Sequence, residues 1–213
     1  MLNLLSNPIL LLVNLAALLV AIGVHEFSHA YVADRLGDPT PRLQGRVTLN
    51  PFAHLDPLGL IFILFVGFGW GKPVQFDPYN LKDPRKEAAI ISIAGPISNF
   101  LLAIVLSLVL RLFMLSGGML YSIGAIIIAP MIYLNIALGV FNLLPIDPLD
   151  GFKIVGGLLP KEQAAEWFSL RRYGFIFLIV LILPLFGNTS MLDMIIRPII
   201  SLISHVLLIG IRM

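Results

Sequence analysis

The chain has 213 residues, of which 58% are hydrophobic and 12% are charged, and its mean hydropathy is +0.96. A soluble globular domain carries about 25% charged residues, so this composition indicates an integral membrane protein in a lipid bilayer. The net charge of +2 is too small to favour nucleic-acid binding, and the lack of cysteine excludes disulfides and thiolate metal ligands. The length suits one helical bundle, so we expect residues 1–213 to form a single domain.

The first apolar segment, residues 8 to about 33, contains an unusual group of ionisable side chains at residues 25–29 (HEFSH). Residues four apart share one face of a helix, so His25 and His29 can both bind one metal ion. Glu26 is then placed to take a proton from a metal-bound water, which is the HExxH pattern of zinc hydrolases. Ionisable residues are costly inside a membrane and usually mark a functional site. The alternative is a pair of buried, hydrogen-bonded histidines beside a glutamate at the membrane surface.

Two polar, turn-rich strips follow, residues 34–56 and 71–87, and each contains a short β-prone piece, at 46–49 and 73–76. The apolar segment between them, residues 58–70, would be only about 20 Å long as a helix, which is short for a membrane span. Lysine and arginine residues flank this segment on both sides, so a crossing would place one basic cluster outside, against the positive-inside bias. We therefore expect a re-entrant segment accompanied by a small membrane-associated β element.

Four further apolar segments are predicted to cross the membrane, at residues 88–115, 122–144, 173–186 and 191–211. Pro96 should kink the first of them and free a carbonyl group. The fold class is therefore an all-α polytopic membrane protein, a bundle of five to six transmembrane helices with its N-terminus outside. On this topology the HEFSH motif and the end of the span at 122–144 both lie towards the cytoplasmic face.

A catalytic zinc needs three protein ligands and an open position for water, and the sequence offers three candidates for the third ligand. Asp150 is favoured because it follows a proline-broken helix end, where a carboxylate can line a polar cavity. Asp147 lies only three residues earlier and is a competitor, and both carboxylates could instead belong to an interfacial acidic loop. His54 could also be a ligand, or a hydrogen-bonded loop histidine.

Three motifs resemble, in this order, the signatures of the site-2 protease family of intramembrane zinc metalloproteases, peptidase family M50. They are residues 25–29 (HEFSH), 95–99 (GPISN) and 142–151 (NLLPIDPLDG). Residues 50–57 (NPFAHLDP) are similar to the compact prokaryotic branch of that family, which lacks PDZ and CBS domains. The resemblance extends from residue 21 to about residue 157.

The resemblance implies one Zn²⁺ per chain, bound by His25, His29 and Asp150, with Glu26 as the catalytic glutamate. It also implies that Asn142 lies by the site and steadies the developing oxyanion. The implied activity is endopeptidase cleavage in or near transmembrane segments of membrane-anchored regulators or signal-peptide-like helices, as in regulated intramembrane proteolysis. The implied location is the prokaryotic cell membrane, with the active site towards the cytoplasm.

Two other classes of protein are compatible with the motifs. A metal-ion transporter would use the same His, Glu and Asp cluster as a transient binding site, but the repeated halves and midplane charges common in transporters are not seen. A catalytically silent membrane scaffold is the second alternative. For a protease, the β-prone pieces at 46–49 and 73–76 could receive an unwound substrate strand by edge pairing. No pattern in the sequence indicates an oligomeric state.

Overall fold

The computed structural model describes residues 7–59, 71–184 and 189–211. Within these ranges the regular structure is helical, which confirms the all-α polytopic class. The helices long and apolar enough to cross a membrane are α2 (Pro8–Leu36), α5 (Pro84–Ser116), α6 (Gly118–Asn142) and α10 (Met191–Leu208). The protein is therefore an integral membrane protein with four candidate spans in the described part of the chain.

Helix α2 has a clear start and a clear end in the sequence. The Asn7 side chain accepts hydrogen bonds from the backbone N–H groups of Ile9 and Leu10, and Pro8 occupies the first turn. Gly37 closes the helix in the left-handed region at φ 108°, where only glycine is unstrained. The helix is continuous between these ends, so the HEFSH motif lies entirely within regular α-helix.

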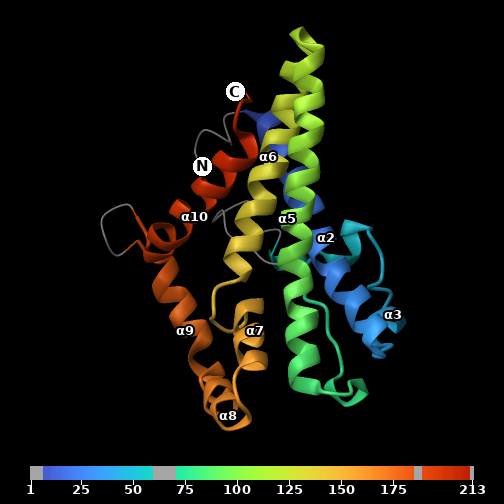
Figure 1. Cartoon of the computed structure of the whole chain (residues 1–213), viewed down its shortest axis with the longest axis vertical. Helices are drawn as coiled ribbons and strands as arrows, with labels where there is room; N and C mark the ends of the chain where they lie inside the picture. The colour runs from blue at the N-terminus through green and yellow to red at the C-terminus, as the bar shows by residue number, and fades with distance from the viewer. Residues whose placement is uncertain (1–6, 60–70, 185–188, 212–213) are drawn as a thin grey trace.

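Helices α2, α5 and α6 lie side by side, with α5 antiparallel to both (Figure 1). The core between α5, α6 and α10 consists of buried aliphatic side chains, among them Ala103, Leu110, Ile132, Ile136 and Ile200. Glycines on α6 allow the close approach: a side chain at Gly139 would begin 3.0 Å from the Phe100 ring. Such contacts between small residues and rings are typical of packing between membrane helices.

After α6 the chain forms α7 (Asp150–Leu158), α8 (Lys161–Ser169) and α9 (Arg171–Ile182), at the same end of the molecule as the start of α5 (Figure 1). Helix α7 packs on α5, where Gly157 leaves room for Ala89. The Arg85 guanidinium on α5 donates to the carbonyl oxygens of Gly156, at 3.3 Å, and Leu159. These contacts hold α7, and with it Asp150 at its first residue, against the first half of α5.

The predicted β element is wrong. Residues 46–49 and 73–76 are extended or bent chain outside any strand, and the pairing near them is one isolated bridge between Leu55 and Gly71. Their backbone groups are bound in other ways: Val74 N–H donates to the Glu26 carboxylate and Arg46 N–H to a carbonyl of the preceding turn. A β-prone sequence forms a strand only where a partner strand is present, and here other acceptors take that place.

The described part of the chain also has fewer candidate membrane spans than predicted, four in place of at least five. The segment predicted to cross at 173–186 forms α9, a helix of 12 residues that is about 18 Å long and therefore too short for a crossing. The helix ends before Leu183 because the residue preceding a proline, here Pro184, disfavours helical dihedral angles. The predicted re-entrant segment at 58–70 lies almost wholly outside the described residues.

Candidate metal centre

Three side chains from distant parts of the sequence converge between α2, α5 and the start of α7. The Nε2 atoms of His25 and His29, on α2, lie 3.0 Å apart. The Asp150 Oδ2 atom, at the start of α7, lies 3.0 Å from His25 Nε2 and 3.1 Å from His29 Nε2. All three residues are buried, and their ligand atoms lie within the reach of one metal ion. Helical spacing places the two imidazoles on one face, and the α5–α7 packing brings the carboxylate to them.

The other ring nitrogen of each histidine is bound to an acceptor. His29 Nδ1 lies 2.7 Å from the carbonyl oxygen of Ile91 on α5. His25 Nδ1 lies 2.7 Å from Asn99 Oδ1, also on α5. The Asn99 amide nitrogen donates to the Ala21 carbonyl oxygen and to Asn135 Oδ1, which fixes the amide orientation and leaves Oδ1 as the acceptor. Both imidazoles therefore carry their proton on Nδ1 and direct the Nε2 lone pair into the cluster.

This donor set fits zinc. A tetrahedral site with metal–ligand distances of about 2.0–2.1 Å places its ligand atoms about 3.3 Å apart, close to the separations observed. Without a cation, two neutral imidazoles protonated on Nδ1 and a carboxylate would bring three acceptor atoms together at hydrogen-bond distance. One bound cation satisfies all three atoms together, and two imidazoles with one carboxylate are a known catalytic zinc set.

Two glycines allow the surrounding backbone to approach the cluster. A side chain at Gly95 would begin 2.5 Å from His29 Nε2 and 2.6 Å from His25 Cε1, so only glycine fits where α5 passes the imidazoles. A side chain at Gly151 would collide with the carbonyl oxygens of Leu143 and Leu144. Both glycines belong to the predicted motifs, and the structure explains them by close packing around the ligands.

Glu26 follows His25 on α2, and its carboxylate accepts a hydrogen bond of 2.8 Å from the backbone N–H of Val74. The strip at 71–87 therefore passes beside the second residue of the HEFSH motif and binds one carboxylate oxygen of the glutamate. That strip is in turn bound to Asp38, just beyond α2, whose buried carboxylate accepts from Asp77 N–H at 2.7 Å and Asn80 Nδ2 at 2.8 Å.

The competing third ligands have other partners. Asp147 forms an ion pair with Arg171, at 3.2 Å between Oδ1 and Nε, and Gly174 packs against it. His54 is fully buried, with Nε2 2.9 Å from the Thr48 carbonyl oxygen, and is not part of the cluster. The Asn142 amide nitrogen donates to Leu138 of its own helix at 3.0 Å, so its contribution to the site stays a prediction.

The model of the Peptidase family M50 matches residues 13–124 and 114–183 of this chain. Bacillus subtilis YwhC, whose name presents it as a candidate zinc metalloprotease, is 43% identical over 174 residues, covering 79% of each chain. The chain belongs to peptidase family M50. Rip2 of Mycolicibacterium smegmatis, also named as a candidate zinc metalloprotease, is 32% identical over 175 residues, covering 79% of this chain and 66% of Rip2. Methanocaldococcus jannaschii MJ0392, named a zinc metalloprotease, is 27% identical over 161 residues, covering 76% of this chain and 38% of MJ0392. No solved structure is significantly similar to this chain.

This M50 member, of the site-2 protease family, is accordingly a zinc metalloprotease embedded in a membrane. Two of its polar side chains had no role in the sequence interpretation. Asn99 lies in the GPISN motif, and Asn135 lies in the second half of α6; both are fully buried. The available signal was the presence of an amide in an apolar span, which marks a polar partner inside the bundle. Their partners could not be identified without the helix packing.

Proposed function

We propose that this M50 protease is an intramembrane endopeptidase, with His25, His29 and Asp150 as zinc ligands and Glu26 as the general base. The observation that carries this proposal is the convergence of three buried ligand atoms, two of them in the apolar span α2. A catalytic centre within a membrane span is suited to peptide bonds in or near the transmembrane segments of anchored substrates. The partners are then the lipid bilayer and a substrate helix, either from a membrane protein or similar to a signal peptide. We propose that residues 1–213 form the single domain that contacts both.

His25, His29 and Asp150 would hold the zinc, which when bound would polarise the scissile carbonyl and make a water molecule more acidic. Glu26 accepts the proton of the attacking water and delivers it to the leaving amide nitrogen. The Val74 N–H holds one Glu26 oxygen in place, so that the carboxylate presents its other oxygen to the water. Asn142 would donate to the oxyanion after exchanging its bond with Leu138 for one with the substrate.

The substrate must unwind before it can react, because a peptide bond in a transmembrane helix is hydrogen-bonded and shielded. Glycine, proline or polar residues near the cleavage site lower the cost of that unwinding. We place the active site towards the cytoplasmic side of a prokaryotic cell membrane, because most of the lysine and arginine residues lie in the segments at that end of the bundle.

The test is cleavage of co-expressed single-span substrates by the wild type and by Glu26→Gln, together with the zinc content of each purified protein. We expect Glu26→Gln to keep its zinc and to lose at least about 100-fold in cleavage rate, as the removal of a general base does. Transport of zinc into proteoliposomes without any cleavage would contradict the proposal, and so would undiminished cleavage by the variant.

A further inference from the structure

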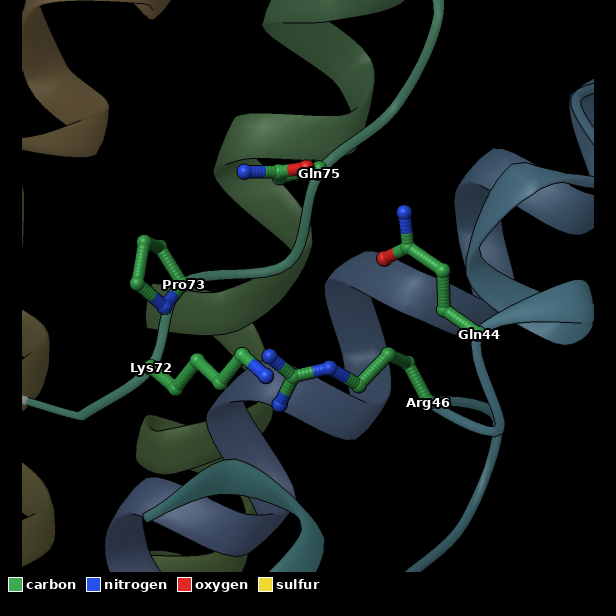
Figure 2. A pocket seen from close by; sticks show the side chains of 5 residues that line it. All are labelled: Gln44, Arg46, Lys72, Pro73 and Gln75. Carbon is green, nitrogen blue, oxygen red and sulfur yellow. The ribbon is translucent and has the colours of Figure 1, made fainter. Parts of the chain in front are cut away.

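A polar cavity of about 360 Å³ opens beside the strip that holds Glu26. It is lined by Gln44, Arg46, Lys72, Pro73 and Gln75. Figure 2 shows the charged ends of Arg46 and Lys72 pointing toward each other, with Gln44 and Gln75 in a separate part of the lining. Every charged group of the lining is thus a cation, and its polar groups supply many hydrogen-bond donors.

Neither cation has a carboxylate partner. All twelve Asp and Glu side chains of the sequence fall within the described residues, and none of them is paired with Arg46 or Lys72. Arg46 is only 4% exposed, and one of its five N–H groups donates to the Ala53 carbonyl oxygen. Two like charges in one cavity, one of them buried, are unfavourable unless an anion joins them.

The cavity adjoins the residue whose backbone binds the Glu26 carboxylate. Pro73 and Gln75 are the chain neighbours of Val74, whose N–H binds Glu26. The segment that Arg46 binds, η1 (Pro51–His54), packs on α2, where a side chain at Gly23 would begin 3.3 Å from Pro51. Gly23 is two residues before His25. The two cations therefore belong to segments that contact α2 at Glu26 and at Gly23, on either side of His25.

We propose that this cavity is a substrate subsite that binds a carboxylate of the polypeptide being cleaved. The proposal rests on the function proposed above and adds a substrate class: chains that carry an acidic side chain or a free C-terminal carboxylate near the scissile bond. A guanidinium binds a carboxylate through two parallel hydrogen bonds, and the ammonium of Lys72 can complete its coordination.

Binding of labelled peptides to full-length Glu26→Gln protein in detergent tests this subsite without cleavage. One short apolar peptide is made in three forms. The neutral form has an internal Gln and an amidated C-terminus. The second form has Glu in place of that Gln, and the third form keeps the Gln but has a free C-terminal carboxylate. Each form is titrated against the Glu26→Gln protein and against the same protein carrying Lys72→Gln or Lys82→Gln. Lys82 is an exposed lysine on the same strip and outside the cavity, so it controls for the loss of one positive charge.

We expect at least one carboxylate form to bind about tenfold more tightly than the neutral amide, as a charge-assisted hydrogen bond allows. Lys72→Gln should abolish that preference, and Lys82→Gln should retain it. A preference for the Glu form identifies an acidic side chain as the ligand, and a preference for the free terminus identifies a chain end. Equal binding of all three forms, or a preference that survives Lys72→Gln, would overturn the subsite. Since the assay requires no turnover, these results are independent of the cleavage test above.

Discussion

At the scale of single residues, the orientation of the proposed metal ligand His25 depends on amide side chains that lie outside the cluster. The His25 Nδ1–H group donates to Asn99 Oδ1, and the Asn99 amide nitrogen donates to Asn135 Oδ1. Each donor in this network therefore has one acceptor, which keeps the His25 proton on Nδ1. Asn135 Nδ2 is bound in turn to the Met131 carbonyl oxygen at 2.8 Å. Because all these groups are buried away from water, each partner is needed to keep the Nε2 lone pair of His25 facing the site.

Removing the acceptor should therefore weaken metal binding. We expect Asn99→Ala to lower zinc affinity by about 10- to 100-fold, the usual effect of losing a hydrogen bond to a metal-bound histidine. Competition with a chelator in detergent measures this affinity. Ser107→Ala is the control, because Ser107 is buried on the same helix and bonds only within it, to Ile104. If Asn99→Ala elutes from a size-exclusion column at the same volume as the wild type, it is folded. Equal zinc affinity of that folded variant would then show that the network does not orient His25.

At the scale of structural elements, Asp38 joins the end of α2 to the strip that holds Glu26. Its carboxylate accepts from Thr40 N–H and Oγ1 as well as from Asp77 and Asn80. Burial alone raises the pKa of the Asp38 carboxyl, but these four hydrogen bonds favour the ionised form and hold the pKa below its ordinary value. The folded state is thus stabilised by the carboxylate above the unfolded-state pKa of about 3.9, and that stabilisation is lost as pH falls through the lower folded-state pKa.

Asp38→Asn should lower the apparent melting temperature at neutral pH, since Asn cannot accept from every donor and a buried unpaired donor costs about 1–3 kcal/mol. The variant should also lose less stability than the wild type between neutral pH and about pH 3, because it lacks the group that titrates. Thermal unfolding in detergent across that range gives both values, with the exposed Glu166→Gln as the control. Parallel pH profiles for the wild type and Asp38→Asn would contradict this assignment.

At the scale of the whole molecule, features that depend on residue spacing along a helix could be predicted from the sequence. Features that depend on contacts between helices could not. The i, i+4 histidines and the proline-broken helix end before Asp150 follow from local periodicity, and the structure brings them together. Asn135 and Arg46 could not be interpreted from sequence, because a buried polar group acquires its meaning from a partner on another element. The prediction of a strand at residues 46–49 is wrong for the same reason, because no described neighbouring strand pairs with them. Helix α9 ends at Ile182, just before Leu183 and Pro184, although the apolar segment predicted from hydropathy continues to residue 186.

The most direct test of the account is the zinc content of purified protein in which each competing carboxylate is removed. We predict one zinc per chain in the wild type, a nearly complete loss in Asp150→Ala, and full retention in Asp147→Ala, which breaks only a partly exposed ion pair with Arg171. Both variants lose one negative charge within the same four residues of chain, so each controls for the other. Zinc retained in Asp150→Ala and lost in Asp147→Ala would contradict the proposed metal centre.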